Sequence, residues 1–523
     1  MNRIGGYRMK QLPQLKKENG VFNLYVDGKP FVALGGEIHN SSSSNLAYMK
    51  EKVWPYLKGL HLNTVILPVY WELIEPVRGE FDFELMDGII EQAREHNVRL
   101  VVLWFGLWKN GRSTYAPGWV KKDYRTFFRA RYQNNGISDT ISPLCEAAVQ
   151  ADASAFKEWM NHLKKVDGDT HTVIMVQVEN EIGFLGSDRD YSDFANATFA
   201  AAVPPEAEAA YGISETWTKS FGEDAGEYFM AYHYAKAIER IASAGTEAYP
   251  LPMFVNAWLE QFPWRAGTYP SGGPIAKVMK LWKATAPTIC LYAPDIYLPN
   301  FAEVCAEYTA GNDNPLFIPE ARRDIVSATN VFYAIGKFDA LCFAPFGIED
   351  FLSPPQDDGG GIDFGLMMAL NIDMSAFQLN GTGPYLARSY ELLGNMMGII
   401  HKHRGTGKMT GFLQNHDNGC LLSLTEYDLK LSYKRQQEGK PIAGGLVIEL
   451  SDNEFILAGI GFSAEFLPKR GESAAVGYIR IEEGKFVDNE WIRSRVLNGD
   501  EAAYGVGVGS HPAALRIEMY KFE

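Results

Sequence analysis

The sequence predicts a (β/α)8 TIM barrel that is followed by a C-terminal all-β sandwich domain and preceded by a short N-terminal hairpin. Two observations indicate the barrel: eight short apolar runs alternate with longer segments of helical periodicity, and these runs are apolar on both faces, as strands of a covered parallel sheet are. A third observation indicates the sandwich, because short runs that alternate apolar and polar residues fill the chain after about residue 409. The length of 523 residues suits a large barrel with one smaller domain.

The predicted hairpin lies near the start of the chain. Two β-rich runs, VFNLYV (21–26) and KPFVALGG (29–36), flank Asp27-Gly28, a pair that favours a tight turn. The second run continues into the first barrel strand. We therefore assign residues 1–30 to an N-terminal segment with a hairpin and residues 31–404 to the barrel.

The barrel strands are predicted from the apolar runs. Their ranges are 31–35, 63–69, 98–104, 172–178, 253–257, 288–292, 315–319 and 340–344. Apolar side chains spaced by three and four residues predict helices around 85–93 and 156–166. Helices are also expected at 224–244, within the long connection between the fourth and fifth strands, and at 384–401, where the barrel ends.

The remaining residues, 405–523, are predicted to form the sandwich. The runs LVIEL (446–450) and YIRIE (478–482) alternate apolar and polar side chains. This pattern is typical of antiparallel strands that bury one face in a core.

Charge and composition restrict the partners of the protein. A formal net charge of −15 argues against binding to nucleic acid and against a general attraction to anionic membranes. The sequence has no run of 18 or more apolar residues, and its opening residues lack the apolar core of a signal peptide. Its five cysteines form no CxxC pair, a pattern that gives no support to a zinc site and is typical of reduced thiols. We therefore expect a cytoplasmic protein without a metal or an organic cofactor, and a homo-oligomer stays open.

Carboxylates follow two of the predicted strands. The fourth strand ends in VQVENEIG (176–183), which carries Glu179, Asn180 and Glu181, and the seventh ends in FIPEA (317–321), which carries Glu320. Active sites of such barrels lie at the carboxyl ends of the strands, and strands three places apart face each other across the mouth. In an extended strand, Glu179 and Glu181 should point to one side and Asn180 to the other, unless a bulge intervenes.

Two opposed carboxyl groups are what glycoside hydrolysis needs. One carboxylic acid protonates the leaving oxygen and the other carboxylate attacks the anomeric carbon, so their environments must hold them in different protonation states. A separation of roughly 5–5.5 Å is expected for a retaining enzyme and about 6.5–9.5 Å for an inverting one. A single Glu after a strand is more often a helix-end charge or an ion-pair partner. Two carboxylates and an amide at the end of a buried strand are costly without a purpose.

Region 21–350 resembles the retaining glycosidases of clan A, in particular the β-galactosidases of families 35 and 42. The resemblance rests on VQVENEIG, on FIPEA, on GGEIHN (35–40) in the first strand, and on YWELIEPVRGEFDF (70–83) after the second. It implies that Glu181 is the general acid/base, that Asn180 binds the sugar 2-hydroxyl and that Glu320 is the nucleophile. It also implies a tyrosine after the sixth strand that hydrogen-bonds the nucleophile, for which Tyr297 is favoured and Tyr292 is the alternative.

The sequence departs from family 35 after the third strand. The family has a Cys-Ala-Glu stretch there that contacts galactose, whereas this chain has FGLWKNGRS (105–113) without a Glu. We predict sugar contacts from Trp108, Lys109 and Asn110, with helix capping or loop packing as the alternative. Glu37 and Glu349, also at strand ends, could hold a hydroxyl or form an ion pair. Tryptophans that could stack on a sugar face are Trp71, Trp258 and Trp264, the first of which is better explained by the core.

The function expected from these features is that of a retaining exo-β-glycosidase that uses double displacement on a carbohydrate substrate. A β-galactosidase acting on small oligosaccharides or glycosides is favoured. A β-glucosidase, an α-L-arabinosidase and a transferase on the same scaffold remain open, as does a non-catalytic carbohydrate-binding barrel.

Overall fold

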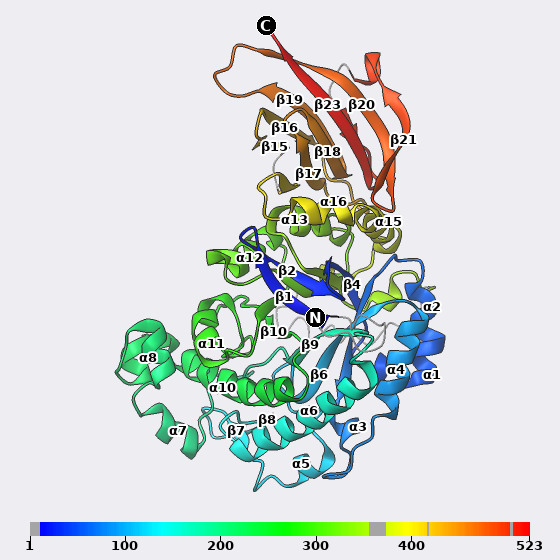
Figure 1. Ribbon diagram of the computed structural model, residues 1–523. Coiled ribbons are helices and arrows are strands. Elements are labelled where there is room, and N and C mark those ends of the chain that lie inside the picture. Colours follow the sequence, from blue (N-terminus) through cyan, green and yellow to red (C-terminus); the bar gives the residue numbers. More distant parts are fainter. Residues whose placement is uncertain (1–10, 355–372, 416–417, 503–505) are drawn as a thin grey trace.

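The computed structural model describes residues 11–354, 373–415, 418–502 and 506–523. It contains a parallel eight-stranded sheet in the order β11-β10-β9-β6-β5-β4-β13-β12 (Figure 1). The strands are β4 (Ala33–Glu37), β5 (Thr64–Tyr70), β6 (Arg99–Lys109), β9 (Val173–Asn180), β10 (Met253–Trp258), β11 (Leu291–Asp295), β12 (Phe317–Ala321) and β13 (Cys342–Pro345). A parallel bridge between Ile296 and Ala321 joins the two outer strands and closes the sheet at its carboxyl end. The predicted barrel is confirmed.

Helices surround this sheet. The longer ones are α4 (Glu84–Glu95), α6 (Glu146–Asp167), α7 (Asp193–Phe199), α8 (Pro205–Tyr211), α10 (Ala225–Ala248), α11 (Met279–Thr285), α12 (Phe301–Thr309), α13 (Ser327–Phe338), α15 (Thr382–Asn395) and α16 (Met397–His403). Shorter ones are α1 (Leu46–Tyr48), α2 (Trp54–Leu57), α3 (Trp71–Ile74), α5 (Gly118–Lys122) and α9 (Trp217–Phe221). Their apolar faces pack on the outside of the strands and form the main core, as the periodicity of 85–93 and 156–166 predicts.

The N-terminal hairpin closes the amino end of the barrel. Strands β2 (Val21–Val26) and β3 (Lys29–Phe31) pair antiparallel around Asp27 and Gly28, whose φ angles of 52° and 76° fit the predicted tight turn. A further strand, β1 (Gln14–Glu18), adds to the hairpin. Leu24 and Val26 join the apolar cluster inside the barrel. This end is therefore filled, and the carboxyl end of the barrel is left for a site.

The C-terminal region forms two antiparallel sheets. One has the order β14-β17-β18-β23-β20-β21 and the other β15-β16-β19-β22, with a separate apolar cluster that draws on both. Their bounds are β14 (Met409–Leu413), β15 (Gly419–Ser423), β16 (Tyr427–Tyr433), β17 (Gly444–Ser451), β18 (Glu454–Ile460), β19 (Phe462–Pro468), β20 (Ala475–Val487), β21 (Glu490–Leu497), β22 (Val506–Val508) and β23 (Ala513–Phe522). The predicted all-β domain is confirmed, whereas the division of the chain at residues 30/31 and 404/405 stays a prediction.

Helices separate the two parts of the molecule (Figure 1). Helix α13 lies against β14 so closely that a Cβ on Gly336 would be 3.0 Å from the Cα of Gly411. The backbone N–H of Gly398 donates to Asn489 in the turn between β20 and β21. The sandwich thus packs on the last helices of the barrel. Within the described residues, no helix has the length and apolar character needed to span a bilayer.

Candidate active site

A cavity of about 220 Å³ opens at the carboxyl ends of the barrel strands. Its lining includes Glu181, Asp295, Glu320, Lys109, Asn110 and Tyr297. These residues lie at or just after the carboxyl ends of β9, β11, β12 and β6, so side chains from distant parts of the chain meet at one point. This is the end of the barrel at which such folds place their chemistry.

Three buried carboxyl groups meet in this cavity. One oxygen from each of Glu181, Asp295 and Glu320 lies within 4.8 Å of one from each of the others. Two of the three are the pair that the sequence singled out. The same spacing could admit a cation, and the Lys109 side chain already supplies a positive charge whose field acts on Glu181.

Glu320 is surrounded by hydrogen-bond donors. The Tyr297 hydroxyl donates to Oε2 over 2.7 Å, and the side-chain amides of Asn180 and Asn256 donate to Oε1 over 3.3 and 3.4 Å. Both oxygens of Glu320 therefore accept hydrogen bonds from neutral donors, and these bonds fix the orientation of its carboxyl group in the cavity.

Glu181 has the opposite environment. Burial, followed by the negative charge of Glu320, raises the pKa of Glu181 to about 8, while Lys109 and Asp295 act in the lowering direction. The Asn110 amide donates to its Oε2 over 2.6 Å, and its own backbone N–H donates to the Asn256 side chain over 2.8 Å. Glu181 is thus protonated at neutral pH, as a general acid must be.

Asp295 is the third carboxyl group and was missed by the sequence reading. Burial and the charges of Glu320 and Glu181 raise its pKa well above the usual value. Its Oδ2 accepts from the Asn256 amide over 2.7 Å, and its Oδ1 lacks a hydrogen-bond partner among the described residues. The Oδ1 atom of Asp295 is therefore available for a hydrogen bond to a ligand in the cavity.

The backbone breaks the expected alternation of Glu179, Asn180 and Glu181. Glu179 and Glu181 have φ angles of 63° and 43°, in a backbone region that residues other than glycine rarely adopt. Glu179 consequently turns away from the cavity and accepts the backbone N–H groups of 106–108. Asn180 is fully buried behind the lining of the cavity, where the Lys109 ammonium donates to its Oδ1 over 2.7 Å and its own amide donates to Glu320. The alternation expected of an extended strand therefore does not hold at Glu179 and Glu181, because the end of β9 is kinked, which is the exception that the sequence left open.

The other predicted contacts differ in where they lie. Lys109 and Asn110 line the cavity, whereas Trp108 is fully buried, donates to the Ile141 carbonyl and packs edge-on against Tyr234. The structure thus places Trp108 in the core and away from a sugar, because its backbone N–H and those of its neighbours bind Glu179 and turn the strand end.

Glu349 and Glu37 also lie apart from the lining of the cavity. Glu349 accepts the backbone N–H of His39 and the Ser42 hydroxyl, so it joins the loop after β4 to the end of β13. Glu37 is fully buried, and neither of its oxygens has a hydrogen-bond partner among the described residues. Burial, followed by the charge of Glu320, raises the pKa of Glu37 well above the usual value, so this carboxyl group is protonated below the site.

The aromatic predictions are resolved by position. Tyr297 touches Glu320, while Tyr292 is buried beside Trp282, so the favoured tyrosine is the one at the site. Trp71 lies in the core and Trp258 lines the cavity. Asn256 was missed together with Asp295. Each is a polar residue at or next to the carboxyl end of an apolar barrel strand, the signal that selected Glu181.

A barrel that holds such carboxyl groups at its carboxyl end resembles the glycosidases of this fold. A family model described as Beta-galactosidase matches residues 49–228, and a domain of unknown function (DUF5597) matches residues 386–509. A β-galactosidase of Xanthomonas manihotis is 28% identical over 183 residues, which are 34% of this chain. The match spans only 28% of the length of that curated relative.

Two solved structures match this chain at low identity. The β-galactosidase from Bacillus circulans sp. alkalophilus has a TM-score of 0.44 and 15% identity, with 60% of this chain and 50% of that chain covered. The cold-adapted β-galactosidase from Rahnella sp. R3 has a TM-score of 0.46 and 13% identity, with 71% and 57% covered.

Proposed function

We propose that this protein is a retaining exo-β-glycosidase and that β-galactosides are its substrates. The observation that carries the proposal is the approach of Glu181 and Glu320, whose nearest oxygens are within 4.8 Å. That approach is of the order of the roughly 5–5.5 Å of retaining enzymes and is shorter than the about 6.5–9.5 Å of inverting enzymes, which place a water between the two groups. The raised pKa of Glu181 and the hydrogen-bond donors around Glu320 support the proposed roles of acid/base and nucleophile.

The reaction proceeds in two displacements. The Glu320 carboxylate attacks the anomeric carbon while Glu181 gives its proton to the glycosidic oxygen, so the bond to the leaving group breaks and a glycosyl ester forms. Glu181, now a carboxylate, takes a proton from water, and that water attacks the same carbon and releases Glu320. Asn180, which is hydrogen-bonded to Lys109 and Glu320, is proposed to hold the 2-hydroxyl of the sugar.

The size of the cavity supports exo action. Its volume of about 220 Å³ is below the roughly 300–1,000 Å³ of pockets that enclose drug-sized ligands, so it suits one terminal sugar unit. The galactoside is supported by the family model over 49–228 and by the named relative. A β-glucosidase or an α-L-arabinosidase remains the alternative, because hydroxyl contacts decide the sugar.

A hydrolysis screen tests the proposal. Nitrophenyl β-galactoside, β-glucoside, β-xyloside and α-arabinoside are incubated with the protein, and the first product anomer is followed by proton NMR. We expect turnover of the galactoside with the β anomer released first. Release of the α anomer would remove the retaining mechanism.

Two variants separate an enzyme from a non-catalytic sugar-binding barrel. Glu320→Gln and Glu181→Gln should each lower turnover by about 10²–10⁴-fold or more with the fold intact. Near-normal turnover in either variant would remove that residue from its role, and no turnover in the parent protein would favour the binding barrel. Transfer of the sugar to an added alcohol in place of water would favour the transferase.

A reducing compartment such as the cytoplasm is the proposed location. Its support is the set of five cysteines, which are free thiols in the structure. Titration of the thiols in freshly purified protein checks this proposal, and size-exclusion chromatography with light scattering decides whether the chain forms a homo-oligomer.

A further inference from the structure

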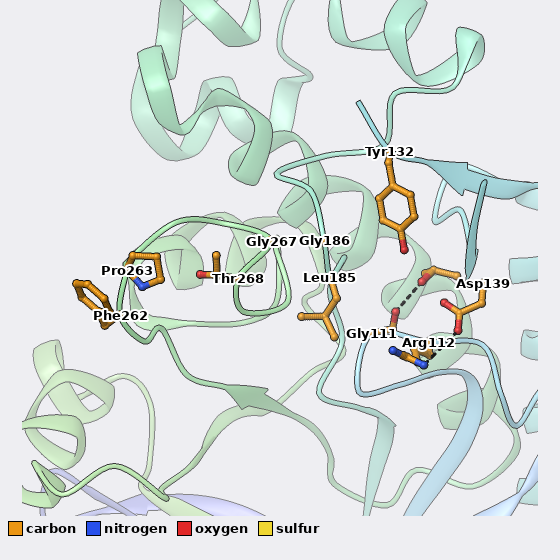
Figure 2. Close-up of a pocket in the computed structure, with 11 residues that line it drawn as sticks. Gly111, Arg112, Tyr132, Asp139, Leu185, Gly186, Phe262, Pro263, Gly267 and Thr268 are labelled. Carbon is orange, nitrogen blue, oxygen red and sulfur yellow. Dashed lines mark hydrogen bonds and ion pairs between the residues drawn. The ribbon is translucent and has the colours of Figure 1, made fainter. Parts of the chain in front are cut away.

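A second cavity, of about 380 Å³, lies beside the candidate active site. Figure 2 shows Phe262 and Pro263 on one side of it, Tyr132, Asp139 and Arg112 on the other, and Leu185 between them. Its walls come from the loops that follow β6, β9 and β10 and from the hairpin of β7 (Arg129–Arg131) and β8 (Ile137–Ile141). The same three barrel strands lead into the catalytic cavity.

The walls of the two cavities are continuous in the chain. Asn110 lines the first cavity and Gly111 the second, and the Gly111 N–H donates to the backbone carbonyl of Glu181 over 3.2 Å. On the opposite side, Gln261 lines the first cavity and Phe262 the second. A ligand that leaves the catalytic cavity along this side therefore meets the second cavity next.

The chemistry of the second cavity suits a neutral, amphipathic ligand. The Phe262 side chain is 64% exposed, and Leu185 and Tyr132 add further apolar surface. Arg112 and Asp139 form an ion pair of 3.6 Å, with side chains 58% and 52% exposed, so their charges balance while their polar atoms face solvent. Sugar rings offer an apolar face to aromatic side chains and hydroxyl groups to such polar atoms.

Hydrogen bonds fix the walls before a ligand binds. The Thr140 hydroxyl donates to the Gly111 carbonyl over 2.6 Å, and the Gly186 N–H donates to the Gly267 carbonyl over 2.8 Å. A site with fixed walls loses little conformational entropy on binding.

We propose that the second cavity binds the neighbouring sugar units of an oligosaccharide whose terminal unit occupies the catalytic cavity. This inference rests on the proposed function. It assigns the natural substrate to neutral oligosaccharides of about three units, because the second cavity is larger than the one that suits a single sugar. Simple glycosides with a small leaving group would not use it.

The test compares substrates that do and do not reach the second cavity. The kcat/KM for β-1,4-galactotriose is divided by that for β-galactosyl fluoride, with the gluco and arabino series run in parallel. We expect this ratio to fall at least tenfold in Phe262→Ala and in Leu185→Trp, which fills the cavity. Tyr124→Ala is the matched control, because Tyr124 is 63% exposed and lines neither cavity. An unchanged ratio in both cavity variants would overturn the inference.

A binding measurement separates this inference from the proposed function. Calorimetry measures the affinity of Glu320→Gln for β-1,4-galactotriose, with and without Phe262→Ala. We expect Phe262→Ala to weaken binding of the trisaccharide at least tenfold more than binding of galactose. If the trisaccharide binds in this way and no glycoside is turned over by the parent protein, the proposed function fails and the second site stands. Equal weakening for both sugars would overturn the second site alone.

Discussion

Glu181 shows how single residues determine the chemistry of the cavity. It shares the cavity with Glu320, yet the two carboxyl groups have different surroundings. Burial and the charge of Glu320 raise the pKa of Glu181 to about 8, while Tyr297 and two amides donate to Glu320. The asymmetry is the requirement of a two-carboxylate mechanism.

The pH profile of kcat/KM should therefore have an alkaline limb near pH 8, set by loss of the Glu181 proton. The Lys109 charge lowers that pKa, so Lys109→Met should move the limb to higher pH, by about one unit. Lys121→Met is the control, because Lys121 pairs with Glu72 and does not line the cavity. A limb that stays in place, or moves to lower pH, would contradict the assignment of Glu181 as the acid.

Asp295 should act in its neutral form. Its pKa is raised by burial and by its two carboxyl neighbours, which favours the neutral form, and Asp295→Asn keeps the shape of that form. We expect Asp295→Asn to keep kcat/KM within about tenfold and Asp295→Ala to lose about 10–100-fold, the cost of an unmade buried hydrogen bond. If Asn were as harmful as Ala, the ionised carboxylate would be the form that matters.

At the scale of elements, the ends of β6 and β9 are held together by a buried carboxylate. Glu179 accepts three consecutive backbone N–H groups of 106–108, which turns the end of β6 and brings Lys109 and Asn110 to the cavity. Gly106 makes this possible. A Cβ there would lie 2.4 Å from Asp152 Oδ2 and 2.6 Å from Glu179 Oε1.

Gly106→Ala should consequently disturb both stability and activity. Because the contacting side chains are buried, we expect a loss of about 1–3 kcal/mol in the free energy of unfolding, measured by urea denaturation, together with a lower kcat. Gly118→Ala is the control, since a Cβ there meets nothing within 4 Å. Equal stability of the two variants would show that the fold does not depend on the hydrogen bonds between Glu179 and the backbone N–H groups of 106–108.

The elements themselves were largely predictable, whereas their ends were not. Each predicted barrel strand overlaps an observed one, because a strand covered on both faces must be apolar throughout. The pattern placed the end of the third strand at 104, but β6 continues to Lys109. Apolar patterns cannot show that extension, because it depends on a carboxylate more than 70 positions away in the sequence.

The candidate site was partly predictable, because charged residues stand out at the ends of apolar strands. Glu181 and Glu320 end strands and stand out as charges after apolar runs. Asp295 and Asn256 have this signal too, but a single polar residue in a short strand does not reveal which face it occupies. The left-handed backbone of Glu179 and Glu181 also reverses the alternation that a sequence reading must assume. The prediction that Trp108 contacts the sugar has the opposite outcome: Lys109 and Asn110 beside it line the cavity, whereas the Trp108 ring is buried in the core.

At the scale of the whole molecule, the barrel encloses several protonated carboxyl groups, and this links its stability to pH. Glu37 is the clearest case, because it is fully buried and its pKa is raised well above an ordinary value of 4.5. The folded protein keeps this proton at a pH where the unfolded chain releases it. Its contribution is present below about pH 4.5 and is lost as the pH rises toward the folded pKa, at about 1.4 kcal/mol per pH unit.

Glu37→Gln should therefore be less sensitive to alkaline conditions. Gln keeps the shape and has no proton to lose, so the fall in Tm between about pH 5 and about pH 8 should be smaller in the variant than in the parent protein. Differential scanning calorimetry at the two pH values measures this. A steeper fall in the variant would mean that Glu37 is ionised in the folded protein.

The sandwich packs on helix α13 of the barrel, while the candidate active site lies in the barrel. Among the described residues, none beyond Phe377 lines the catalytic cavity. Helix α13 lies between β12, which carries Glu320, and the strand β14 of the sandwich. The sandwich therefore packs on the outside of the barrel, and the described residues that line the cavity all come from the barrel.

In the proposed mechanism, Glu320 forms a covalent bond to the sugar while Glu181 acts as the acid. A 2-deoxy-2-fluoro-β-galactoside with a dinitrophenyl leaving group, or its counterpart for the sugar that the screen selects, slows the second displacement and traps the intermediate. Mass spectrometry of the digested protein should find one fluorosugar on Glu320, and none in Glu320→Gln. A fluorosugar on another residue, or hydrolysis of this compound without a trapped ester, would contradict the account.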